Sequence, residues 1–277
     1  MGFSTSTGAS RASIIGQVVW GSKNPDLPLP NIRFYDKEKK EESYLVPIGT
    51  RAQAKVSGVI TRFSIGQVPS YQDKEQNTGE TNLFRAYLTL DGGADEPLAV
   101  LAFDVFDRKA EKVDSNSLQL INSVASHLEA VQRGELPADA PVEIGFYRKP
   151  NPNNKDKPFP ASIIRLPSEY DEAGNPVFGD AKNFVRSESL PPRGVPMKKP
   201  DGQPLMVNGQ QVYDHSEAIA WVEGKIGVLL EAYKKEDATA AEKEAQTSAG
   251  ATDAPAADLS GVAEDAVAAA QRQRASA

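Results

Sequence analysis

The segment YRKPNPNNKDKPFP, residues 147 to 160, holds the side chains of this chain that are best suited to binding chemistry. Its basic residues are Arg148, Lys149, Lys155 and Lys157. They accompany one acid, Asp156, in a chain whose formal net charge is −7, and the rings of Tyr147 and Phe159 flank them. Cations pair with phosphate oxygens, and flat rings stack on exposed bases. This composition predicts a loop that binds an anionic polymer with exposed rings; the alternative is a solvated hairpin tip.

Further cations and rings lie on neighbouring segments that are predicted to be strands. Strict alternation in LFRAYLTL, residues 83 to 90, places Arg85 and Tyr87 together on its polar face. Tyr147 and Lys149 share a face of a later strand by the same rule. The other candidates are Arg62, Tyr71, Lys74 and Arg165. Together these residues would form one track of rings and cations. The alternative is that the rings are half-buried strand aromatics and that the cations only solvate an edge.

The sequence contains no group of residues that predicts catalysis or metal binding. Cysteine is absent, and the two histidines, His127 and His215, lie in separate predicted helical regions without clustered partners. Asp104 and Asp107 are three residues apart at the end of a strand, which turns their carboxylates to opposite faces. We therefore expect a protein that is not an enzyme and that uses no cofactor and no metal.

The elements that must position the candidate residues follow in the order β-β-β-α-β-β. They are predicted at residues 54–63, 83–90, 98–106, 117–134, 142–149 and 159–166. This is the order of the OB-fold, a five-stranded Greek-key barrel, and it predicts a mainly β protein. Gly58 would let the first strand bend round a barrel corner. The loops at 64–82 and 147–160 are the two with which this fold grips oligonucleotides.

The rest of the chain is predicted to form three further segments. Residues 1–53 are expected to be an N-terminal β extension packed on the barrel of residues 54–166, with a hairpin whose tip is KEKKEE. Residues 167–235 are expected to hold a surface loop, a hairpin at Asn208-Gly209 and an amphipathic C-terminal helix from about Ser216. The Ala-rich residues 236–277 have no aromatic side chain and a net charge of −5, so they are predicted to be a disordered acidic tail.

Residues 54–166 resemble the bacterial and phage single-stranded DNA-binding proteins. The resemblance rests on the element order, on Gly58 in the first strand, on the IGQVP segment after it and on the basic hairpin between the last two strands. It implies a sequence-tolerant single-stranded DNA-binding protein that acts in DNA replication or recombination, or as a cofactor of phage transcription. The chain ends in QRQRASA rather than in the family's acidic cluster, which puts docking through that tip in doubt. The extra segments favour a phage or plasmid member.

The expected location and partners follow from the same observations. The start MGFSTSTGAS lacks the basic and apolar regions of a signal peptide, and no apolar run approaches the ~20 residues of a membrane span. We therefore expect the host cytoplasm, no membrane, and single-stranded DNA as the ligand. The sequence leaves open DNA against RNA, a phage polymerase or other replication protein as a partner, and a homo-oligomer. The rival hypothesis is a structural or assembly component of a virion or conjugation apparatus.

Overall fold

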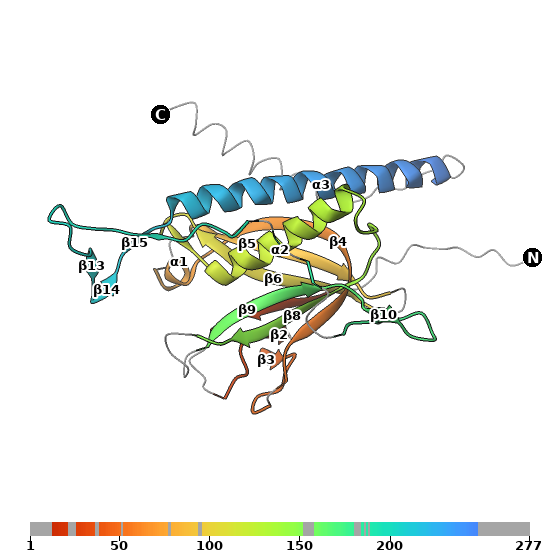
Figure 1. Ribbon diagram of the computed structural model, residues 1–277, viewed down its shortest axis with the longest axis horizontal. Coiled ribbons are helices and arrows are strands. Elements are labelled where there is room, and N and C mark those ends of the chain that lie inside the picture. Colours follow the sequence, from red (N-terminus) through yellow and green to blue (C-terminus); the bar gives the residue numbers. More distant parts are fainter. Residues whose placement is uncertain are drawn as a thin grey trace, which may run out of the picture. The chain divides into compact units, whose positions relative to one another are not determined.

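The structure is a computed structural model, and it describes residues 13–21, 26–36, 39–50, 52–76, 79–93, 96–151, 158–179, 184–185, 187 and 189–248. It divides the chain into two compact units, Met1–Lys234 and Lys235–Ala277. All described strands belong to the first unit (Figure 1). The protein is mainly β with few helices, as the sequence predicts.

A curled half-barrel sheet of nine strands forms the body of the first unit (Figure 1). Its strands are β1 (Ser13–Val19), β2 (Asn31–Asp36), β3 (Glu41–Tyr44), β4 (Lys55–Val68), β5 (Leu83–Asp91), β6 (Leu98–Asp107), β7 (Lys112–Val113), β8 (Val142–Lys149) and β9 (Phe159–Arg165). Their order is β3-β2-β1-β6-β5-β4-β8-β9, and β7 pairs with β6. Neighbouring strands are antiparallel, except that β1 runs parallel to β6.

Gly58 lies where β4 changes its partner strand. Residues 55 to 58 pair with β8, and residues 59 to 68 pair with β5. The φ angle of Gly58 is +150°, and a Cβ at this position would lie 2.6 Å from the carbonyl oxygen of Asp91. Both observations require glycine here. A register shift between Ile60 and Arg62 bends the strand further. Gly58 therefore marks the point where β4 passes from β8 to β5.

Two helices complete the core of the first unit. They are α2 (Ser115–Gln132) and α3 (Ser216–Ser248), and the described side chains of α3 up to Tyr233 share one buried cluster with α2 and the sheet. Polar contacts fix α3 at two points, because Arg108 pairs with Glu223 at 2.7 Å and Lys225 pairs with Glu129 at 2.8 Å. The helices therefore cover one face of the sheet.

The ends of α2 follow the expected capping chemistry. The carboxylate of Asp114 accepts hydrogen bonds from the backbone N–H groups of Asn116 (2.9 Å) and Ser117 (3.0 Å), which satisfies donors that a helix start leaves free. Gly134, with φ of +73°, follows the C-terminal residue Arg133. The predicted helix at 117–134 is confirmed with its start two residues earlier.

Short elements fill the connections between these larger ones. They are α1 (Tyr71–Gln76), β10 (Glu169–Tyr170), β11 (Pro176–Val177), β12 (Val195–Pro196), β13 (Met206–Val207), β14 (Gln210–Gln211) and β15 (Tyr213–Asp214). The three ribbons are β10–β11, β12–β15 and β13–β14. Asn208 and Gly209 have φ angles of +50° and +76° between β13 and β14. The hairpin predicted at Asn208-Gly209 is therefore confirmed.

The sheet differs from a separate five-stranded barrel. The five strands predicted for the barrel are adjacent in the order β6-β5-β4-β8-β9, but the outer edge of β6 pairs with β1. The N-terminal strands β1, β2 and β3 thereby continue the same sheet instead of lying against it. Parallel pairing between residues so far apart in sequence has no local signal, so the sequence could not predict it.

Two local expectations were wrong. The first barrel strand was predicted to end at residue 63, but β4 continues to Val68, and α1 occupies part of the predicted loop. The segment SYLVPI, residues 43–48, follows the hairpin tip KEKKEE, and its apolar side chains favour the second strand of the hairpin there, but β3 is Glu41–Tyr44. The apolar Leu45 and Val46 resemble strand residues, but Val46 donates its N–H to the side chain of Asn31, and a turn follows at Pro47.

The C-terminal segment begins as helix. α3 runs to Ser248 and so includes residues 236 to 248 of the segment predicted to be disordered. Residues 249–277 lie outside the described part of the chain. None of the helices in the described residues is long and apolar enough to cross a membrane.

Candidate nucleic-acid interface

The side of the sheet that faces away from the core brings together three of the predicted binding residues. Along β5 the buried residues Ala86 and Leu88 alternate with half-buried Arg85 and Tyr87. Arg62 of β4 is exposed and lies opposite Thr89 of β5. We call this outward face of β4, β5, β6, β1, β2 and β3 the platform. The alternation inferred from the sequence is confirmed for β5.

Tyr87 is held against the platform by its neighbours. It lies opposite Ser64 on β4 and Ala102 on β6. A Cβ placed on Gly66 would be 3.4 Å from Cε2 of Tyr87, so the ring lies over that glycine. One side of the ring therefore packs on the sheet while the residue stays partly open to solvent. A ring in this position is suited to stack on a base.

The two predicted arginines of the platform, Arg62 and Arg85, differ in how their charge is balanced. Nε of Arg85 pairs with Oδ1 of Asp104 at 2.6 Å, so a phosphate would have to compete with a carboxylate. Arg62 takes part in no ion pair among the described residues. Its exposed guanidinium is available to an incoming phosphate. Arg62 is therefore the stronger phosphate-binding candidate.

The β8–β9 hairpin gathers a second group. Lys149 and Phe159 lie directly opposite each other at its outer end, and both are exposed, Phe159 to 51%. Tyr147 is half-buried opposite Ala161. Arg148 donates from Nε to the carbonyl oxygen of Leu29 at 2.7 Å, which ties the hairpin to the connection between β1 and β2. Lys155 and Lys157 lie outside the described residues.

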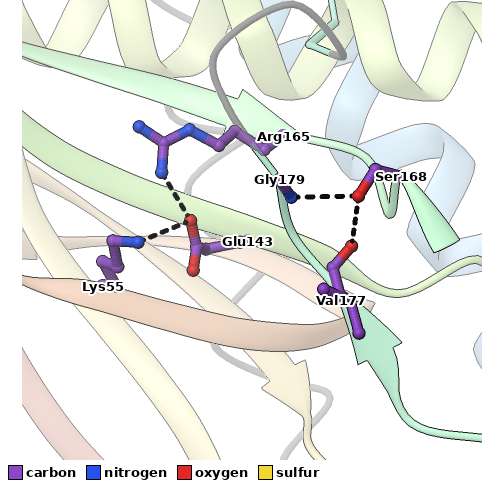
Figure 2. Close-up of polar contacts among 6 residues, drawn as sticks. All are labelled: Lys55, Glu143, Arg165, Ser168, Val177 and Gly179. Carbon is purple, nitrogen blue, oxygen red and sulfur yellow. Dashed lines mark hydrogen bonds and ion pairs between the residues drawn. The ribbon is translucent and has the colours of Figure 1, made fainter. Parts of the chain in front are cut away.

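Arg165 is engaged in a compact ion-pair network (Figure 2). Its Nη1 lies 2.7 Å from Oε1 of Glu143, and Nζ of Lys55 lies 3.4 Å from the same oxygen. The side chain of Arg165 is only 15% exposed. A carboxylate shared by two cations at such a site holds strands β4, β8 and β9 together. Arg165 has a structural partner, and its role as a DNA contact stays a prediction.

The side chain of Ser168 forms hydrogen bonds to the backbone of the β10–β11 ribbon. Figure 2 shows Ser168 between two backbone groups: its hydroxyl donates to the carbonyl oxygen of Val177 at 3.0 Å and accepts from the N–H of Gly179 at 3.1 Å. These bonds close the β10–β11 ribbon just after β9. The bonds of Ser168 therefore fix the β10–β11 ribbon, which is a separate two-stranded sheet.

The last two predicted residues lie on α1. Lys74 is exposed there, and for Tyr71 the structure describes the backbone alone. The twelve predicted residues thus fall into separate groups: three on the platform, four on the β8–β9 hairpin, two on α1, one in the ion-pair network and two outside the described residues. A single continuous track remains a prediction.

A hollow elsewhere on the first unit is less suited to an anionic ligand. It has a volume of about 770 Å³ and lies beside Gly58, Asp91 and the β10–β11 ribbon. Its lining includes the acids Asp91 and Glu96 and no cation. A phosphate-bearing ligand would meet negative charge there. The exposed rings and cations of the sheet surface are therefore the better site.

Neither a metal site in the described residues nor a similarity to known proteins indicates a function. Within the described ranges, no group of three or more His, Asp or Glu side chains is placed to hold a metal ion. His127 is buried in α2, where burial lowers its pKa below the usual value. No family model, curated protein or solved structure matches the chain.

Proposed function

We propose that this protein is a non-enzymatic, sequence-tolerant single-stranded DNA-binding protein, acting in DNA replication or recombination or as a cofactor of phage transcription. The observation that carries the proposal is the pairing of an exposed cation with a partly exposed ring on each of two surfaces. Arg62 and Tyr87 provide the pair on the platform, and Lys149 and Phe159 provide it on the β8–β9 hairpin.

An OB-like arrangement of the central strands supports the proposal. The order β6-β5-β4-β8-β9, with α2 between the third and fourth strands in sequence, is the neighbour relation of the OB-fold. In that fold the face of the second and third strands and the loop between the fourth and fifth strands bind oligonucleotides. Tyr87 lies on the second of these strands, and Lys149 and Phe159 flank the corresponding loop.

The chemistry of the two surfaces fits a single strand better than a duplex. Stacking on a ring needs an unpaired base, and it tolerates any base because every base has a flat face. Cations beside the rings would pair with the phosphates that follow each stacked base. Binding is therefore expected to favour single strands and to vary little with base composition.

A gel shift with a labelled oligonucleotide at several salt concentrations tests the proposal. We expect the full chain to retain the single strand at low salt and the matching duplex much less. Its affinity should fall with salt by about 0.7 log unit per neutralised phosphate for each tenfold increase. A preference for duplex, or no retention at low salt, contradicts the proposal.

A second candidate function, assembly through protein contacts, is favoured by a different observation. The segment that holds β12 to β15 exposes several large apolar side chains. They are Leu190, Val195, Met197, Met206, Val207 and Tyr213. Short two-stranded ribbons bury little surface of their own. If the gel shift shows no binding, this segment is the region to test for protein partners.

A further inference from the structure

The register of strand β1 against β6 determines which of its residues face outward on the platform. Its register against β6 places Ile15 beside Val100 and Gln17 beside Ala102. Gly16, between them, points toward the core, where an added Cβ would collide with Cγ2 of Ile32. Gly16 therefore has to face inward, which turns Ile15 and Gln17 outward.

Cross-strand registers carry this outward row on to β2 and β3. Tyr87 lies opposite Ala102, Gln17 lies opposite both Ala102 and Arg33, and Arg33 lies opposite Tyr44. The row crosses five strands, and at about 4.8 Å per strand it extends about 19 Å from β5 to β3. The platform therefore extends three strands beyond the central strands β4, β5 and β6.

Strands β1, β2 and β3 contribute tyrosine rings to the platform, and also the guanidinium of Arg33, which hydrogen bonds hold in place. Arg33 donates from Nη2 to Gln17 and from Nη1 to Oε1 of Glu42 at 2.9 Å. Tyr44 donates to the other oxygen of Glu42 at 3.2 Å. Tyr35, two residues from Arg33 on the same strand, also emerges on this side and is 57% exposed, as is Ile15. An arginine plane and tyrosine rings on an exposed sheet face are stacking groups.

The charge on these strands limits what they can bind. Glu42 balances Arg33, and Asp36 and Lys39 form a further pair at 3.6 Å near the end of the hairpin. Lys40 and Glu41 are exposed beside them, so the described charges on these strands balance. A phosphate gains little from a surface with no net charge, whereas a base can stack on its rings. The added strands are therefore suited to bases and not to the phosphates.

We propose that β1, β2 and β3 extend the single-strand site, so that a strand leaving Tyr87 continues across β6 and β1 and stacks its bases on Tyr35 and Tyr44. The inference rests on the proposed function, and it adds a length requirement. An oligonucleotide that covers only the central strands does not reach the added rings. A longer one gains affinity from them without neutralising more phosphates.

The test compares a short and a long single-stranded oligonucleotide, about 3 and about 20 nucleotides, which lie below and above the site sizes of OB-folds, about 4 to 16 nucleotides. The full chain with Tyr35→Ala and Tyr44→Ala should bind the long strand about a hundredfold more weakly than the parent, about tenfold for each ring, with the same salt slope. It should bind the short strand as the parent does. Replacing both rings by Phe should restore the affinity, because the ring and not the hydroxyl stacks. Tyr170→Ala, which removes a ring of similar exposure on β10, is the matched control and should change nothing.

Two outcomes would overturn the extension. One is a Tyr35/Tyr44 alanine variant that binds the long strand like the parent while Tyr87→Ala weakens it; the proposed function then stands with a site confined to the central strands. The other is a parent protein that binds neither oligonucleotide, in which case the proposed function fails as well. Melting temperatures of all variants show whether each one is folded.

Discussion

Arg62 and Tyr87 lie on one face of the sheet, but they would contribute different terms to the binding of a strand. Arg62 is exposed and would replace a counterion on one phosphate. Tyr87 is uncharged and would stack on one base. The two side chains can therefore be separated by the salt dependence of binding, which senses only the first kind of contact.

We expect Arg62→Ala to lower the salt slope by about 0.7 log unit and Tyr87→Ala to leave the slope unchanged while it weakens binding by about tenfold. Fluorescence anisotropy with a labelled single strand at four or five salt concentrations gives both quantities. Arg193→Ala removes an exposed arginine just before β12 and serves as the control with no effect. Equal slopes for Arg62→Ala and the parent would place the phosphate path elsewhere.

The sequence predicted the residue types of the platform but not their pairing. Alternation alone was enough to place Arg85 and Tyr87 outward. The partners of Arg85 and Arg165 are Asp104 and Glu143, which lie on neighbouring strands. Such partners depend on the register between strands, and register is set by bulges and by packing that no single segment encodes. A list of cations read from sequence therefore overestimates the number that are free.

At the scale of elements, the well-predicted segments are those with a strong local period. Against the elements expected at 83–90, 98–106 and 117–134, β5 and β6 begin at the expected residue and end one residue later, and α2 begins and ends two residues earlier. The parallel strand β1 was expected to lie outside the barrel, because pairing with a strand about 85 residues later leaves no trace in local composition. This missed pairing is the one that widens the platform.

The helix α2 also carries a titratable group that links stability to pH. His127 is 3% exposed, and neither ring nitrogen has a hydrogen-bond partner among the described residues. Burial lowers the pKa of His127 below the usual 6.5. Below about pH 6.5 the unfolded chain therefore takes up a proton that the folded protein does not bind, and the free energy of unfolding falls as the pH falls.

We expect urea unfolding to show a lower free energy of unfolding at pH 5.5 than at pH 7.5, by at most about 1.4 kcal/mol per pH unit from this residue. His127→Leu removes the group and should flatten that part of the pH dependence. His215→Gln, which removes the other histidine at the start of α3, should retain it. If the parent and His127→Leu show the same pH dependence, His127 is not its source.

At the scale of the whole chain, the distribution of charge adds a competitor for the proposed site. Residues 236–277 carry a net charge of −5, of which −3 lies in residues 236–248, so the preceding 235 residues carry only −2. An acidic segment of the same chain is attracted to exposed cations at a high effective concentration. It therefore competes with the phosphates of a DNA strand for those cations. This argument needs only the attachment and the charge.

Two truncations that remove different amounts of negative charge test whether the segment competes with DNA. A chain ending at Ser248 loses a net charge of −2, and a chain ending at Lys235 loses −5. We expect single-strand affinity at low salt to be at least that of the full chain for both, with the larger gain for the shorter chain, and the difference should shrink as salt screens the attraction. Changing five of the eight acids of the segment to their amides in the full-length chain is the matched control, because it brings the net charge of the segment from −5 to zero and keeps the length. Weaker binding by either truncation, or a full-length amide variant that binds no more tightly than the parent, would show that the segment does not compete and that its charge has another use.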